Sequence, residues 1–382
     1  MNPTTIQIDT LAHGGNGIGR IEGQVCFVPY GLPGDTLQVR IVRQTKSALW
    51  AEIDTVLEAS PHRTRSACPH FGTCGGCTWG HFDYPTQAEW KQRIARDTLA
   101  HMGGIDTEVA WIEDPSLRLA YRTRAEFHGD GKALGFYARG SHQIVDVEAC
   151  PLCHRKLNTT LRQLRDIGLK GTVTVTANPE GEEVMVWTKF TQRRLKHRFP
   201  LADTPKDERR SRFLLDGVPI VNGTFSQSSL LLNRLLVREA HAMIGKPVSL
   251  LDLYCGNGNL SLGLHEKIRV VGMDHNRTAV KAAKARHRGD YRPGDEAKMR
   301  KLLRKDEWDT VLLDPPRTGA KEIMETLAAA HARAIVYVSC DPATLARDLK
   351  ILCAAGWRVT QAKAIDMFPY TPHVETLCRL ER

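Results

Sequence analysis

The sequence predicts a multidomain α/β protein with three parts. Residues 1–58 are expected to form a small OB-like β-barrel, 59–212 a central α+β domain with a cysteine cluster, and 213–382 a Rossmann-like domain. Three observations predict this: short strand runs between glycine-rich turns, clustered cysteines, and a C-terminal alternation of apolar strand runs with helical segments. A chain of 382 residues is long enough for two or three domains, each with its own core.

The N-terminal part has the pattern of a closed barrel. Short strand-like runs such as 24–29 and 36–42 are separated by turn signals at 14–17 and 31–35. Leu37, Val39 and Ile41 alternate with polar residues, as in a strand with one buried face. About five such strands make a small barrel that leaves no exposed sheet edge.

A cluster of cysteines follows the barrel. Cys68, Cys74 and Cys77 lie on a turn loosened by two glycines, so their thiolates can converge on a metal centre. Cys150 and Cys153 are the candidates for a fourth ligand. Four thiolates suit zinc as well as an iron-sulfur cluster, so ligand count leaves both open.

Residues 84–102 are predicted to form an amphipathic helix. Trp90, Ile94, Leu99 and Met102 fall near one face of it, which is typical of a packing helix. We expect this helix to pack on the C-terminal domain. Strand-like runs after it complete the α+β pattern of the central part.

The C-terminal domain contains a nucleoside-cofactor pattern. The strand run 248–254 leads into a loop with Gly256 and Gly258, and Asp274 ends the next strand. Glycines let the backbone approach a ligand, and the acid accepts hydrogen bonds from ribose hydroxyls. Ser261 stands where a dinucleotide fingerprint has its third glycine, which argues against a pyrophosphate. S-adenosylmethionine, which has no phosphate, fits this loop better.

Charge and hydropathy limit the partners and the compartment. The net charge of +10 favours a polyanionic partner. No apolar run approaches the roughly 18 residues of a membrane span, and the N-terminus has no secretory pattern. We therefore expect a cytoplasmic protein without membrane contact.

Two further motifs follow predicted strands of the same domain. The motif Asp-Pro-Pro-Arg at 314–317 ends one strand, and Cys340 ends the next. Both should face one crevice, because ligands bind at the carboxyl ends of parallel strands. His373 and Glu375 lie close together near the C-terminus. A single strand-end cysteine is more often a core residue than a nucleophile, so these neighbours decide its interpretation.

Taken together, these motifs resemble the RNA uracil-5 methyltransferase family, specifically its bacterial 23S rRNA (uracil-5-)-methyltransferase branch. The resemblance covers essentially the whole chain and includes a TRAM-like pattern at 17–19 and 27–35. It implies an RNA-binding TRAM barrel, a class I S-adenosylmethionine-dependent methyltransferase domain and 5-methyluridine as the product in rRNA processing. It also implies a [4Fe-4S] cluster, with the ligands Cys68, Cys74, Cys77 and Cys150.

Site residues carry over at matching positions. The resemblance makes Cys340 the nucleophile that adds to C6 of uracil, and Glu375 the general base. Asp341 differs from the Asn that often follows the catalytic cysteine, which we expect to affect loop geometry more than chemistry. The donor-binding positions that match are Gln227, Tyr254, Asn259, Asp274, Gly294 (where the alignment is poorest) and Asp314.

The expected partner is 23S ribosomal RNA with a single-stranded or looped uridine, bound by a monomer. A tRNA uracil-5 methyltransferase and a non-catalytic RNA-binding iron-sulfur protein remain alternatives. An RNA cytosine-5 methyltransferase would show Pro-Cys where 314–316 reads Asp-Pro-Pro. An amino-group methyltransferase would need an aromatic residue in place of Arg317.

Overall fold

The computed structural model describes residues 4–190, 193–286 and 289–382. Its N-terminal strands close into a barrel in the order β1-β2-β3-β5-β4. Alternate side chains such as Ile6, Val28 and Leu37 point inward and are fully buried. The barrel strands are β1 (Thr4–Leu11), β2 (Gly17–Ile21), β3 (Gln24–Val28), β4 (Thr36–Gln44) and β5 (Ala48–Glu58).

A second sheet forms the centre of the chain, in the order β12-β11-β10-β7-β8-β9. Helix α2 (Arg155–Asp166) covers one face of it through Leu157, Leu161 and Leu164, spaced to fall on one side of the helix. A short helix, α3 (Arg193–Arg198), lies near β12. The strands are β7 (Arg124–Asp130), β8 (Leu134–Tyr137), β9 (Ile144–Asp146), β10 (Lys170–Ala177), β11 (Val184–Thr188) and β12 (Ala202–Asp203).

The third sheet has eight strands in the order β17-β16-β15-β18-β19-β21-β20-β6. Neighbours from β17 to β19 pair in parallel, whereas β21 runs antiparallel between β19 and β20. The strands are β6 (Val109–Ile112), β15 (Ser249–Leu253), β16 (Arg269–Asp274), β17 (Asp290–Pro293), β18 (Trp308–Leu313), β19 (Ala332–Ser339), β20 (Arg358–Ile365) and β21 (Glu375–Glu381).

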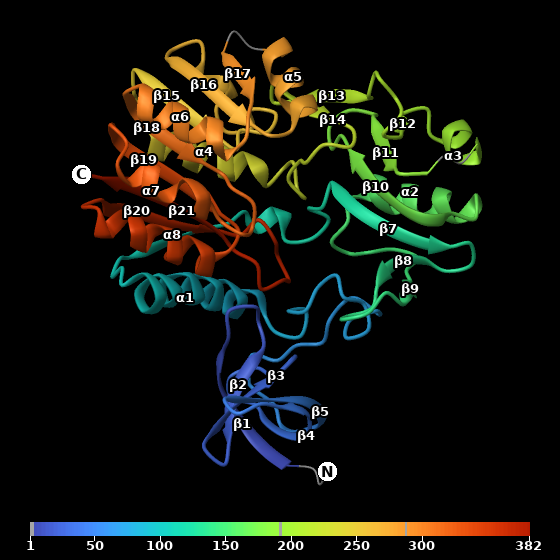
Figure 1. The fold of residues 1–382 in the computed structure, drawn as a ribbon. Helices are drawn as coiled ribbons and strands as arrows, with labels where there is room; N and C mark the ends of the chain where they lie inside the picture. Colours follow the sequence, from blue (N-terminus) through green and yellow to red (C-terminus); the bar gives the residue numbers. More distant parts are fainter. Residues whose placement is uncertain (1–3, 191–192, 287–288) are drawn as a thin grey trace.

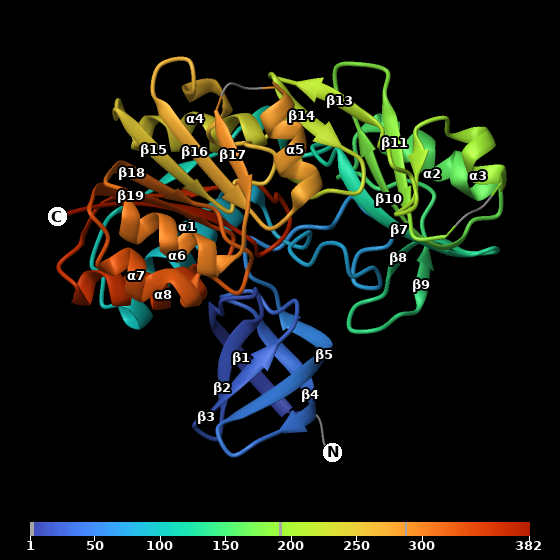
Figure 2. The same ribbon diagram turned by 45° about the horizontal axis from the view of Figure 1, so that its top comes forward.

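Helices lie on both sides of this sheet (Figures 1 and 2), as expected of a doubly wound fold. A hairpin of β13 (Arg212–Leu215) and β14 (Val218–Val221) precedes the domain. The helices are α4 (Asn233–Ile244), α5 (Arg277–Arg286), α6 (Glu296–Lys305), α7 (Met324–Ala328) and α8 (Pro342–Ala354), and single 3-10 turns are η1 (Pro115–Leu117), η2 (Leu262–Leu264) and η3 (Lys321–Ile323).

Helix α1 (Tyr84–Gly103) packs against α8, and β6 after it pairs with β20 at the edge of the third sheet. Its buried face differs from the predicted one. Ile94 and Leu99 are buried as expected, but Met102 is 50% exposed, and Lys91 is completely buried. No helix in the described residues is long and apolar enough to cross a membrane, α1 included.

The barrel meets the rest of the molecule at one end (Figures 1 and 2), through the turn between β1 and β2. The indole Nε1 of Trp79 donates to the carbonyl of Gly15 at 3.1 Å. His13 Nε2 lies 3.9 Å from Asp341 Oδ1, beside the predicted nucleophile. The turn between β1 and β2 therefore lies beside the loop that follows β19 of the third sheet.

Replacing Gly15 by alanine should loosen this contact. A Cβ at Gly15 would lie 2.5 Å from Trp79 Nε1 and 2.6 Å from Pro372 Cβ. Gly14 is the matched control, because its φ is also positive, at +91°, but its Cβ would meet nothing within 4 Å. We expect Gly14→Ala to lose about 1 kcal/mol of unfolding free energy and Gly15→Ala about 2 kcal/mol more, measured by urea denaturation. Equal losses would show that the contact does not stabilise the barrel.

Candidate active site

The predicted donor loop is built at the carboxyl end of β15. Tyr254, Gly256 and Gly258 all have left-handed φ angles, of 62°, 54° and 81°. This conformation folds the backbone tightly and turns its N–H groups toward the end of β16, where Asp274 Oδ2 accepts from Gly256 N–H at 2.9 Å. The loop and the acid thus form one unit, as nucleoside binding requires.

Buried carboxyl groups surround this loop. Burial raises the pKa of Asp252 to about 8, with smaller contributions from Asp314 and Asp274. Burial and then Asp274 raise the pKa of Asp314 to about 7. Asp252 Oδ2 is buried without a hydrogen-bond partner among the described residues. A cationic ligand suits such a site, because positive charge offsets the mutual repulsion of the carboxylates, and S-adenosylmethionine carries a sulfonium.

The other predicted donor-binding residues lie near the loop in different ways. Asn259 exchanges side-chain hydrogen bonds with Asn233 of α4, at 2.7 and 2.8 Å. Gly294 N–H donates to the carbonyl of Asp274, and a Cβ there would lie 2.4 Å from Met273 Sδ, so a larger residue would displace the Met273 side chain. Gln227 is buried in the loop between β14 and α4.

The central domain holds the loop that carries Gln227. The backbone N–H groups of Thr123 and Arg124 both donate to the carbonyl of Ser228. Arg124 Nη1 also donates to Ser226 Oγ at 3.2 Å. Phe225 in the same loop is 73% exposed. The second sheet thus anchors both sides of Gln227 and leaves an aromatic side chain open to solvent.

The structure brings Cys340 and Glu375 together. Cys340 follows the last residue of β19, and Glu375 begins β21, which pairs with β19 so that Ser339 faces Thr376. Burial, and then the nearby Glu375, raise the pKa of Cys340 to about 11. Burial and then Asp314 raise the pKa of Glu375. A thiol and a buried carboxyl therefore share one end of the sheet with the donor loop.

Arg317 is a site residue that sequence reasoning did not assign. Its guanidinium hydrogen-bonds the sulfur of Cys340 and opposes the rise in the pKa of both Cys340 and Glu375. Burial, followed by Arg317, lowers the pKa of His373 to about 4, so this imidazole is neutral near pH 7. The signal was available in the Asp-Pro-Pro-Arg motif, where a cation follows a strand that ends beside the cysteine.

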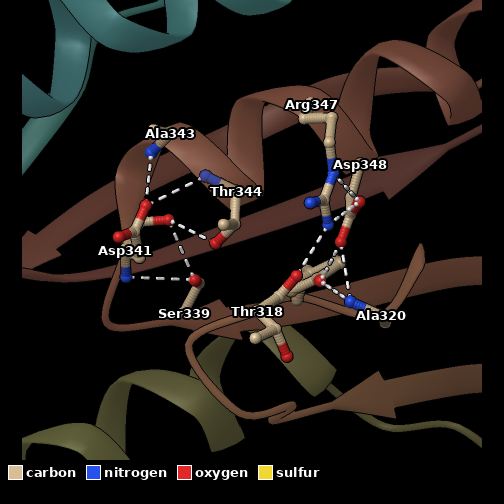
Figure 3. Close-up of polar contacts among 9 residues, drawn as sticks. Thr318, Ala320, Ser339, Asp341, Ala343, Thr344, Arg347 and Asp348 are labelled. Carbon is tan, nitrogen blue, oxygen red and sulfur yellow. Dashed lines mark hydrogen bonds and ion pairs between the residues drawn. The ribbon is translucent and has the colours of Figure 1, made fainter.

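Figure 3 shows how helix α8 holds the segment 339–341 at its start and the loop 318–320 that follows β18. Asp341 caps the helix, because Oδ1 accepts from the N–H groups of Ala343 and Thr344, each at 3.0 Å. Buried Asp348 accepts from Ala320 N–H at 2.8 Å, in the loop that carries Arg317. The Asp at position 341 therefore acts on loop geometry.

The four predicted metal ligands line one small cavity, together with His70 and Arg122. Burial, followed by the other thiols, raises the pKa of Cys77 to about 12. A hydrogen bond from Cys153 lowers the pKa of Cys150 to about 6. In the described residues, however, no three His, Cys, Asp or Glu side chains are arranged to hold a metal ion. The four cysteines line one cavity, and the predicted [4Fe-4S] cluster is not shown.

The buried carboxyl of Asp252 predicts a pH dependence of stability in the protein without donor. Its pKa rises from 3.8 in the unfolded chain to about 8, so the folded state binds this proton more tightly. Stability should therefore fall as pH rises from about 4 to 8. We expect the Tm to fall between pH 5 and 8, and to fall less in Asp252→Asn, as measured by calorimetry.

Asp290→Asn is the control, because that carboxylate is paired with Arg292, which lowers its pKa. The Tm of Asp290→Asn should fall between pH 5 and 8 by as much as that of the wild type. An Asp252→Asn profile parallel to the wild type would contradict the assignment of a buried, proton-binding carboxyl.

Comparison with known proteins identifies the family. Residues 4–53 match the TRAM domain, and 298–382 match the family described as tRNA (Uracil-5-)-methyltransferase. The 23S rRNA (uracil(1939)-C(5))-methyltransferase RlmD of Aromatoleum aromaticum is 31% identical, over 98% of this chain and 99% of that protein. An uncharacterized RNA methyltransferase of Gloeobacter violaceus is 33% identical, over 99% and 96%.

A solved structure agrees. The tRNA (uracil-54, C5)-methyltransferase of Pyrococcus abyssi, in complex with S-adenosyl-L-homocysteine, superposes with a TM-score of 0.78 at 25% identity, covering 98% of this chain and 99% of that one. The likeness extends over barrel, central domain and catalytic domain together. The chain belongs to the family of S-adenosylmethionine-dependent RNA (uracil-5-)-methyltransferases.

Proposed function

We propose that this chain methylates C5 of a specific uridine in 23S ribosomal RNA, with Cys340 as the nucleophile and Glu375 as the general base. The observation that carries the proposal is the register of β19 and β21, which sets these two side chains next to each other. The donor loop after β15 and Asp314 after β18 open at the same end of the sheet. Nucleophile, base and methyl donor can thus meet around one base.

The chemistry explains why a thiol and a carboxylate are needed together. C5 of uracil is a poor nucleophile, but addition of the Cys340 thiolate to C6 gives an enolate that is nucleophilic at C5. S-adenosylmethionine supplies the electrophilic methyl group. Glu375 then removes the C5 proton; the electron pair of that C–H bond forms the C5–C6 double bond, and the C6–S bond breaks. The thiolate leaves, and 5-methyluridine remains.

Arg317 supports the first step. Cys340 must lose its proton although burial raises its pKa to about 11. The guanidinium of Arg317 favours the thiolate through a charge-assisted hydrogen bond. The raised pKa of Glu375 serves the last step, because a more basic carboxylate accepts a carbon-bound proton more readily.

The RNA must present the uridine outside a helix. A thiolate on one face and a methyl donor at C5 cannot reach a stacked, paired base. We propose that the barrel and the central domain bind the flanking RNA by single-stranded bases and phosphates. The stacked pair of Phe27 and Trp50, with Arg43 4.7 Å above the Trp50 ring, supports this, because aromatic rings and a cation suit unpaired bases.

The ribosomal substrate is proposed from the RlmD relatives, and transfer RNA is the second candidate because of the P. abyssi structure. Deleting the gene should remove 5-methyluridine from one or more positions of 23S rRNA, and wild-type protein should restore it. Cys340→Ala should restore none, because it removes the thiol that adds to C6 of the uridine. Sequencing-based mapping of 5-methyluridine in both RNA classes checks this. Loss in tRNA alone would overturn the ribosomal assignment.

Cys353→Ala is the matched control for Cys340→Ala. Cys353 is a partly buried thiol on α8 that lies outside the site. Its alanine variant should keep wild-type methyl transfer. Cys340→Ala should still bind the RNA, as measured by filter binding, because only the covalent step is lost. Methyl transfer by Cys340→Ala would disprove the mechanism.

We further propose that Cys68, Cys74, Cys77 and Cys150 hold a [4Fe-4S] cluster that supports folding and RNA binding. Their gathering around one cavity supports this, since thiolates are the ligands of such clusters. Arg122 lines the same cavity, and its Nε has no hydrogen-bond partner among the described residues, so a cation is available to offset the thiolates' charge. The proposed chemistry transfers no electron, so none of its steps depends on the cluster.

Anaerobically purified protein should contain about four iron and four sulfide ions per chain. Cys150→Ser should lose them, whereas Cys153→Ser should retain them, because Cys150 lines the cavity with the other three thiols and Cys153 does not. Elemental analysis and visible absorption provide the measurement. Stoichiometric zinc, or no metal in folded protein, would contradict the proposal.

A further inference from the structure

The base Glu375 is delivered by the loop 366–374, which joins β20 to β21. Three successive backbone carbonyls of this loop each accept a hydrogen bond from outside the loop. Lys91 Nζ donates to the carbonyl of Phe368 at 2.9 Å, Tyr121 Oη to Pro369 at 3.1 Å, and the backbone N–H of Trp79 to Tyr370 at 3.1 Å. The loop is thus held along its backbone.

All three donors come from segments that precede the catalytic domain in sequence. Trp79 lies two residues after Cys77, Lys91 is on α1, and Tyr121 precedes β7. Each of the three donor residues has no exposed surface. Hydrogen bonds shielded from water in this way keep their geometry, because no solvent molecule competes for the carbonyl.

Lys91 holds the loop a second time. Its Nζ lies 2.7 Å from Asp366 Oδ1, and the two side chains are 0% and 1% exposed. Asp366 also accepts from the hydroxyl of Tyr84 and from the backbone N–H of Phe368. A buried ion pair is retained only with such full hydrogen bonding, because desolvation of two charges is otherwise too costly.

The loop needs this support because its backbone is strained. Tyr370 has a φ of 63°, a backbone conformation that residues other than glycine rarely adopt. Such strain, of the order of 1 kcal/mol or more, persists only where the surroundings impose it. Without the three donors the loop would relax, and Glu375 at its end would shift relative to Cys340.

We propose that Lys91, Tyr121 and Trp79 are positioning residues for Glu375, so that the segments before the catalytic domain control removal of the C5 proton. The inference rests on the proposed function of Glu375. None of the three residues is required to contact RNA or donor. Their loss should therefore slow the last step and leave the addition of Cys340 and the binding of S-adenosylmethionine in place.

The covalent adduct gives a specific readout. When proton removal is slow, the C6–S bond persists after the methyl group has reached C5, and enzyme remains linked to methylated RNA. Tyr121→Phe removes only the hydroxyl that reaches Pro369. We expect about a tenfold lower kcat, unchanged affinity for S-adenosylmethionine, and accumulated adduct on denaturing gels with methyl-labelled donor. Lys91→Met should show the same with a larger loss.

Two variants serve as controls. Glu375→Gln should accumulate the adduct most strongly, since the base itself is gone. Trp357 lies just before β20, at the end of the sheet opposite the site, and donates its buried indole N–H to the carbonyl of Ala328. Trp357→Phe removes this donor and should lower stability without accumulating adduct. Denaturation midpoints of all variants show how much of any effect is general destabilisation.

The outcomes separate the two proposals. Adduct in both Glu375→Gln and Tyr121→Phe supports the inference. Adduct in Glu375→Gln with wild-type behaviour in Tyr121→Phe overturns the inference and leaves the proposed function intact. No adduct in Glu375→Gln overturns the assignment of the base, and the inference with it. Tyr121→Phe keeps the test decisive even where Lys91→Met does not fold.

Discussion

The structure depends on one geometric constraint: parallel strands all end at the same edge of their sheet. Tyr254, Asp274, Asp314 and Cys340 follow or end four neighbouring parallel strands, so chain direction alone collects them. Glu375 cannot join them in this way, because its strand runs antiparallel and must begin at that edge. A loop has to bring the chain back to the site, and the residues before the catalytic domain hold that loop.

The site combines several buried carboxyl groups with a nearby cation, Arg317. Burial raises the affinity for protons of three carboxyl groups, Asp252, Asp314 and Glu375, and Asp314 adds to this effect at the other two. The cation Arg317 opposes this effect around Cys340. The donor's sulfonium adds positive charge on binding and leaves as a neutral thioether after transfer, so the field around Glu375 differs before and after methylation. That change has the sign that favours transfer of a proton to Glu375 in the proposed last step.

The sequence could reveal those parts of the site that lie within short motifs. The glycine loop, Asp-Pro-Pro-Arg, Ser-Cys and the spaced cysteines are local patterns, and the strand order then places them. The support of the loop before Glu375 could not be predicted, because Lys91 and Asp366 are far apart in the chain and either alone reads as a surface charge. Met102 of helix α1 lies on the same side of the helix as the buried Lys91, but in the last turn, and it is exposed there. Arg317 was visible in its motif, but its effect on Cys340 depends on the pairing of β18 with β19, which brings the ends of the two strands together.

The contact of Trp79 with Gly15 has a consequence for the choice of RNA. A barrel on a flexible tether would accept binding sites at many separations from the target base. Here the turn of the barrel is fixed against the loop that leads to Glu375, with room for glycine only. The barrel and the catalytic edge then form a ruler: an RNA that engages both must present its two contact points at one set separation. Selection of the RNA by length and shape would add to the specificity that contacts with the target uracil provide. It would operate before any covalent bond is formed.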